Sequence, residues 1–141
     1  MIIFALVIAT AYYFLHTKTC DNEYCFLAAL KHCEKTQYKV NKEGNIWEYK
    51  ILNSFGFSNN VCSVNVKNVK IASDDIIIKK IEGKEMLCKI PKDYAGSYIE
   101  VHQKLEFCSG PLKESLQEII VSNMYKYIIQ NLGEISQEVK Y

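Results

Sequence analysis

The first clear pattern of hydrophobic and polar positions lies in residues 20–33. Phe26, Ala29, Leu30 and Cys33 recur there at steps of three and four residues. This spacing places them on one face of a helix. Either Asp21 or Asn22 can cap its start, since a short side-chain oxygen accepts a hydrogen bond from a free amide of the first turn. The pattern predicts one short helical segment that holds Cys20, Cys25 and Cys33.

The next segments alternate between apolar and polar residues, which is typical of half-buried strands. A turn at residues 43–45 separates the first two strands, and residues 82–83 close a predicted hairpin. In residues 61–71 the apolar positions change parity after Val66, which predicts a bulge near Lys67 and Asn68. The expected strands cover residues 37–42, 46–52, 61–71, 76–81, 84–90 and 98–107.

A long helix is predicted to follow Gly110 and Pro111, because proline suits a first helical turn and Gly133 is a typical stop signal. Its apolar residues form two stripes, which is more than a surface helix needs. We expect the helix to be sandwiched within the domain, with contact to another subunit as the alternative. One stripe comprises Leu112, Leu116, Ile119, Ile120, Met124, Tyr127 and Ile128, and the other Val121, Tyr125 and Ile129.

Together these elements predict an α+β fold, in which a Cys-rich helix precedes an antiparallel meander of five to six strands and a long C-terminal helix packs on the sheet. We expect residues 1–18 to be a hydrophobic leader or membrane anchor, residues 19–133 to be one disulfide-stapled domain and residues 134–141 to be a frayed tail. A chain of 141 residues is long enough for one such domain.

The leader, residues 1–15, is apolar but shorter than the roughly 20 residues of a spanning helix. It also lacks the basic region of a secretory signal. Three interpretations remain: a start that lies further upstream, an already processed N-terminus, or a retained short anchor. All three place the residues after Lys18 outside the cytoplasm. The alternative is a buried N-terminal helix of a soluble protein.

Six cysteines in a chain with an apolar N-terminus predict a disulfide framework of an exported domain. On a helix, Cys25 and Cys33 are about 12 Å apart along the axis, too far to pair with each other. We therefore expect each to pair with a downstream cysteine. Free core thiols and a zinc site are the alternatives. The predicted disulfide residues are Cys20, Cys25, Cys33, Cys62, Cys88 and Cys108.

Composition argues against several functions. The net charge is +1, and all 17 basic residues are lysines, so we expect no nucleic-acid partner and no arginine-based phosphate site. Nucleotide-binding, hydrolase and metalloprotease motifs are absent from the sequence. Of the three histidines, His32 beside Cys33 is the candidate for thiol or zinc chemistry, and we expect His102 to sit in a cross-strand ion pair. We predict no catalytic residue, no cofactor and no metal.

Three functions fit these patterns. The first is an extracytoplasmic, membrane-tethered or secreted binding or structural domain, with the membrane reached through the N-terminal segment and a protein partner or a second copy through the C-terminal helix. The second is a filament subunit, because an apolar N-terminal helix that runs into a soluble helix and then a sheet resembles the pilin family in element order. The third is a thiol- or zinc-dependent enzyme around Cys25, His32 and Cys33.

Overall fold

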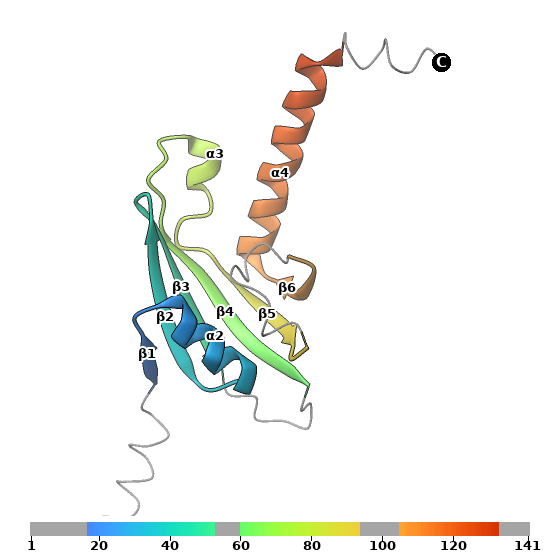
Figure 1. Ribbon diagram of the computed structural model, residues 1–141. Coiled ribbons are helices and arrows are strands. Elements are labelled where there is room, and N and C mark those ends of the chain that lie inside the picture. The colour runs from blue at the N-terminus through green and yellow to red at the C-terminus, as the bar shows by residue number, and fades with distance from the viewer. Residues whose placement is uncertain (1–16, 53–59, 94–104, 133–141) are drawn as a thin grey trace, which may run out of the picture.

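The computed structural model describes residues 17–52, 60–93 and 105–132, and it has the α+β fold that the sequence predicts (Figure 1). A six-stranded sheet carries one helix near its N-terminal edge and a long helix at its other edge. The strands are β1 (Lys18–Cys20), β2 (Thr36–Lys42), β3 (Asn45–Leu52), β4 (Val61–Lys70), β5 (Glu85–Pro91) and β6 (Cys108–Ser109). The helices are α2 (Glu23–His32), α3 (Ile76–Lys79), a 3-10 turn (Leu105–Phe107) and α4 (Pro111–Gln130).

The sheet follows chain order, β1-β2-β3-β4-β5-β6, and every neighbouring pair is antiparallel except β1 and β2. The parallel edge strand β1 was not predicted. It has three residues, too few to show an alternating pattern, and Lys18 and Thr19 are exposed. The helix α2 makes the crossover between the two parallel strands, as parallel pairing requires.

One face of the sheet forms the core and the other faces solvent. The buried residues of neighbouring strands lie in register, with Ile51 opposite Val64 and Val64 opposite Cys88. The helices contribute Phe26, Leu30 and Leu112 to the same cluster. The intervening positions are mostly polar, as is usual for an antiparallel sheet with one solvated face. On that face the carboxylate of Glu48 accepts a hydrogen bond from the side chain of Gln37 and forms an ion pair with Lys50.

The predicted change of register in β4 is present, but it lies slightly further along the strand. Asn68 pairs with Trp47 and Lys70 pairs with Ile46, so Val69 is the extra residue. Asn68 stays on the inner face with Val66 and is fully buried. The parity change therefore follows Asn68, and Ile71 returns to the core.

The helix α2 confirms the predicted apolar face, although it is shorter than the segment 20–33. Phe26, Ala29 and Leu30 are buried, and Asn22 is the N-cap, with its Oδ1 accepting a hydrogen bond from the amide of Cys25 at 2.9 Å. Cys33 ends the helix in the left-handed conformation, with φ 52°. Cys20 is outside the helix, in β1.

The expected strand at residues 76–81 is wrong. Ile76–Lys79 is a four-residue helix, because Asp75 caps it by accepting a hydrogen bond from the amide of Ile77 at 2.8 Å. Both edges of β4 are already paired, to β3 and to β5, so the isoleucines have no place beside it. Ile81 alone of this segment is buried, while Ile76 is 81% exposed.

The expected strand at residues 98–107 is wrong in its described part. Leu105–Phe107 is a 3-10 turn, and the strand that pairs with β5 is β6, the next two residues. The remainder of that prediction, including His102, lies outside the described residues. So do His16, Gly133, the leader and the C-terminal tail.

The long helix begins where predicted, with Gly110 as N-cap and Pro111 in its first turn. Gly110 has φ 118°, and an added Cβ there would lie 3.3 Å from the carbonyl oxygen of Glu85. The start of α4 contacts β5 and β6, after which the helix extends away from the sheet (Figure 1). It is therefore not sandwiched within the described domain. None of the described helices is both long and apolar enough to cross a membrane.

Candidate functional site

Three disulfides connect the N-terminal helix, the sheet and the last strand. They pair Cys20 with Cys25, Cys33 with Cys62 and Cys88 with Cys108, with Cα–Cα distances of 5.6, 5.3 and 3.9 Å. All six cysteines are thereby oxidised. The first bridge joins β1 to the start of α2, the second joins the end of α2 to β4, and the third joins β5 to β6.

The expectation that Cys25 pairs with a downstream cysteine is wrong, although Cys25 and Cys33 do not pair with each other. Cys20 lies in β1, and the chain turns at Asp21 and Asn22 before α2 begins. This turn brings Cys20 beside the first turn of the helix, where Cys25 lies. A reading of residues 20–33 as one helix misses this pair because the turn falls between the two cysteines.

The residues expected to carry thiol or zinc chemistry do not form such a site. Cys33 is bonded to Cys62 and Cys25 to Cys20, so neither has the thiolate that a nucleophile or a zinc ligand needs. His32 lies exposed in the last turn of α2. Within residues 17–52, 60–93 and 105–132, no group of His, Cys, Asp and Glu side chains could hold a metal ion.

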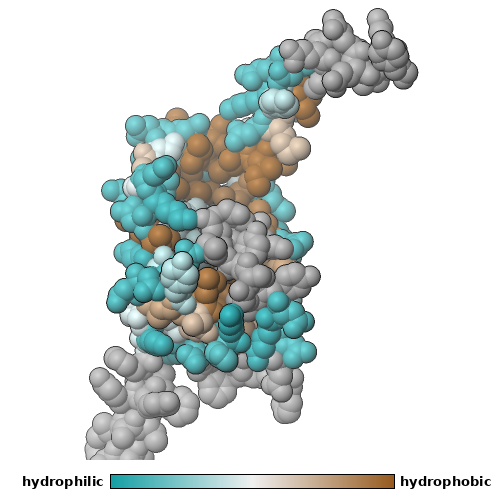
Figure 2. Space-filling view, viewed as in Figure 1, coloured by the Kyte–Doolittle hydropathy of each residue, from teal (hydrophilic) through white to brown (hydrophobic). Residues whose placement is uncertain are grey.

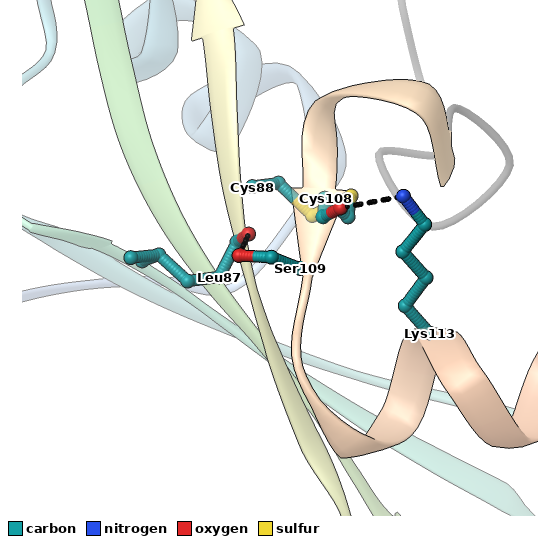
Figure 3. The surroundings of a disulfide bond; sticks show 5 residues. All are labelled: Leu87, Cys88, Cys108, Ser109 and Lys113. Carbon is teal, nitrogen blue, oxygen red and sulfur yellow. Dashed lines mark hydrogen bonds between the residues drawn. A yellow bond between two sulfur atoms is a disulfide. The ribbon is translucent and has the colours of Figure 1, made fainter.

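The third disulfide holds the segment that leads into α4 (Figure 3). Beside the bond between Cys88 and Cys108, Ser109 Oγ donates to the carbonyl of Leu87 at 3.5 Å. From the first turn of α4, Lys113 Nζ reaches back and donates to the carbonyl of Cys108 at 2.9 Å. The base of α4 is thus fixed to the sheet by a covalent bond and by hydrogen bonds.

The far half of α4, together with Leu132 just beyond its C-cap Asn131, carries the largest set of exposed apolar side chains among the described residues. After Ile119, which is half-buried, eight large apolar side chains are each between 46% and 66% exposed. Soluble proteins seldom expose a contiguous patch of so many large apolar side chains unless the patch binds a partner. We call this set the distal face: Ile120, Val121, Met124, Tyr125, Tyr127, Ile128, Ile129 and Leu132.

The distal face does not continue the face by which α4 packs on its own domain. Leu112, Ser115, Leu116 and Ile119 point toward the sheet. Further along the helix, that direction is occupied by polar residues, namely Ser122, Asn123, Lys126 and Gln130. At about 100° per residue, the distal face covers an arc of about 200° on the remaining side, which includes Asn131 as its one polar residue.

In the space-filling view, hydrophobic side chains gather along α4 and toward α3, whereas hydrophilic residues dominate the lower part of the same view (Figure 2). The helix α3, which carries the exposed Ile76 and Ile77, lies at the same end of the sheet as α4 (Figure 1). A shallow, solvent-open hollow on the outer side of α4 is lined by Glu114, Gln117, Glu118, Val121, Ser122 and Tyr125.

Part of this site could be predicted from the sequence. The two apolar stripes were visible, and the alternative of contact with another subunit followed from them. The exposure of these stripes could not be predicted, because the sequence of a helix does not reveal how far along its length the sheet extends. The scarcity of charged residues was a usable signal for an apolar contact surface, since Lys126 is the single charged residue between Ile119 and Leu132.

The filament alternative loses its structural basis at the junction after the leader. Continuity of an apolar helix into the soluble helix is the feature that resembles a pilin. Here the strand β1 and the extended Asn22, with ψ 164°, separate α2 from everything before it. Comparison with known proteins gives no further relationship: no family model, no curated protein and no solved structure matches this chain.

Proposed function

We propose that the protein is an extracytoplasmic, membrane-tethered binding module that contacts a protein partner through the distal face of α4. The apolar residues 1–15 serve as the tether, and the disulfide-bonded sheet holds α4 in a fixed position. We assign the protein a binding role without catalysis. The observation that carries this proposal is the exposure of the distal face on a helix whose base is fixed covalently and by hydrogen bonds.

The compartment is supported by the cysteines. Disulfides persist in oxidising environments and are rare where glutathione and thioredoxin keep thiols reduced. All three bonds join different elements, including an edge strand to a helix and a helix to a central strand. An exported domain is consistent with this arrangement, and export is also what the apolar leader predicts.

The binding role is supported by the contrast between the two halves of α4. The first half has its apolar residues against the sheet and two of its three charged residues, Glu114 and Glu118, exposed on the outside. In the second half this arrangement is reversed. Its polar side chains lie on the side of the helix that packs against the sheet in the first half, and its apolar side chains lie on the outer side. A helix that stays in solvent normally carries polar residues on its outer side, whereas a helix that docks on another protein presents an apolar side to it.

The tether and the compartment are tested together in the native host. Protease added to intact cells should remove the domain. Replacement of residues 1–15 by a cleavable secretory signal, which leaves β1 intact, should release the oxidised domain from the membrane fraction. A domain that is protected from external protease, or that carries free thiols in cells, would contradict the proposal.

The proposed contact through the distal face is tested by introducing a negative charge into that face. In intact cells, the natural chain should form a specific cross-linked complex, and Ile128→Glu should abolish it. Gln130→Glu is the matched control, because it places the same charge two residues away, on the polar side of the same helix. Equal complex formation by both variants would show that the distal face is not the contact surface.

A further inference from the structure

We infer that the partner of the distal face is the same face of other copies of this chain, packed as a parallel helical bundle of more than two subunits. This inference rests on the proposed function and specifies its partner. The seam of the bundle consists of Val121, Tyr125, Ile128 and Leu132, which are between 46% and 66% exposed in the single chain.

The spacing of the seam is that of a coiled coil. Its four residues alternate steps of four and three, and the last of them, Leu132, lies just beyond the C-cap of α4. Val121 and Ile128 then occupy d positions, and Tyr125 and Leu132 occupy a positions. Leu132 and Ile128 are the one pair here with leucine at a and isoleucine at d, a combination that favours three or four helices over two.

The residues beside the seam also favour more than two helices. In a two-stranded coiled coil, charged residues at e and g usually flank a narrow apolar seam. Here Met124 and Ile129 flank the seam and are 59% and 51% exposed. The arc of about 200° that the distal face covers is wider than one neighbouring helix can bury, so each helix needs a neighbour on both sides.

The domains leave room for such a bundle. The seam lies about 160° around α4 from the residues that pack on the sheet, at about 100° per residue. With the seam at the centre, each domain therefore lies on the outside of the bundle. Glu114 and Glu118 occupy the corresponding seam positions nearer the domain. Repulsion between carboxylates of neighbouring copies ends the seam there, where the helices diverge toward their domains.

The available area, summed over the two neighbours of each helix, equals what one partner buries in a standard interface. A standard interface buries about 800 Å² on each partner. The eight side chains of the distal face, each about half exposed, offer on the order of 800 Å² in total. Lys126, the one charge in this half of α4, lies on the polar side and does not face a neighbouring copy.

The orientation agrees with a common membrane tether. The chain enters the sheet at β1, at the lower end of the molecule in Figure 1, and the distal half of α4 lies at the upper end. Copies anchored in one membrane by residues 1–15 would all direct α4 away from it. They would therefore meet in parallel. The same geometry separates the distal face from the tethering membrane, so lipid is disfavoured as its occupant.

The first test measures the number of subunits of the full-length, oxidised chain in detergent, by sedimentation equilibrium at matched solvent density. We expect three or four copies for the natural chain and for Gln130→Glu, and a monomer for Ile128→Glu at the same concentration. Formation of the same three disulfides in both variants would show that the domain is intact. A monomeric or dimeric natural chain, or an unchanged assembly of Ile128→Glu, would overturn the inference.

The second test separates this inference from the proposed function. A photo-cross-linking amino acid replaces Tyr125 in the full-length chain in its host membrane, and Gln130 in the control. Adducts at whole-number multiples of the chain mass from position 125, and not from position 130, are the expected result. An adduct with a different protein would overturn the inference and leave the proposed function standing. A lipid adduct, or none, would overturn both.

Discussion

Lys84 Nζ donates a hydrogen bond to Ser115 Oγ at 2.6 Å, and this contact links the residue just before β5 to the second turn of α4. Ser115 is buried, and Lys84 is half-buried with its backbone held by β4, since the amide of Asn68 donates to the carbonyl of Lys84 at 3.0 Å. The bond lies at the point where α4 leaves the sheet. It therefore helps to set the direction in which the distal face projects.

Removing this contact should destabilise the domain. We expect Ser115→Ala to lower the free energy of unfolding by about 1.5 kcal/mol, because a hydrogen bond to a charged group contributes about 1.5 to 3 kcal/mol and the half-buried Lys84 can recover some hydration. Urea titration measures the change. In a double-mutant cycle with Lys84→Met, the two losses should not add; full additivity would show that the side chains do not interact.

The three disulfides should differ in their effect on stability according to the loop that each one closes. Cys33 and Cys62 are 29 residues apart, whereas Cys20 and Cys25 are 5 apart. In the chain-entropy model, loops of these sizes correspond to about 3.5 and about 2 kcal/mol. Cys33→Ala with Cys62→Ala should therefore lower the free energy of unfolding more than Cys20→Ala with Cys25→Ala does. Urea titration of the two double variants checks the order.

Thr36 offers a stabilising substitution. It is fully buried at the start of β2, and its Oγ1 has no hydrogen-bond partner among the described residues. A buried hydroxyl without a partner costs about 1 to 3 kcal/mol, so Thr36→Val, which keeps the shape, should raise the free energy of unfolding by about 1 kcal/mol. Thr19→Val, at an exposed position of β1, is the control and should change little. A loss of stability in Thr36→Val would reveal a hydrogen bond to that hydroxyl.

Tyr38 should make stability fall at high pH. It packs against Phe26 and Tyr49, with ring centroids 5.6 and 6.1 Å away. Burial raises its pKa above the usual 10.0, the charge of Glu23 raises it further, and Lys42 lowers it. The unfolded chain therefore loses the phenolic proton first. The contribution of Tyr38 to the free energy of unfolding is complete below pH 10, and it is lost as the pH rises through the pKa of Tyr38 in the folded chain.

Phenylalanine at this position provides the comparison. The difference in unfolding free energy between Tyr38→Phe and the natural chain should shift in favour of the variant as the pH rises above 10. Urea titrations at neutral and alkaline pH measure it. A difference that stays constant with pH would show that the Tyr38 pKa is the same in the folded and unfolded chain.

The parts of the fold that the sequence predicted correctly are those where local pattern and tertiary contacts agree. The alternation in β3 and β4 was sufficient, because Tyr49, Ile51, Val64 and Val66 all meet the same core. The helix α2 was recognised for the same reason, from its apolar face and its Asn22 cap.

The errors have tertiary causes. Ile76, Ile77 and Ile78 have high strand propensity, yet the neighbouring strands already pair with both edges of β4. The link between Cys20 and Cys25 depends on a turn without a strong sequence signal. The exposure of the distal face depends on the width of the sheet, which no residue of α4 encodes.

Mapping the disulfides in protein taken from its own host tests the account most directly, because compartment, lack of thiol chemistry and the fixed base of α4 all depend on oxidised cysteines. Free thiols are alkylated before lysis, and cleavage after Lys and Glu separates Cys20 from Cys25 at Glu23. Mass spectrometry without reduction should then find no alkylated cysteine and three linked pairs, Cys20–Cys25, Cys33–Cys62 and Cys88–Cys108. Alkylated cysteines, or a different set of pairs, would contradict the account.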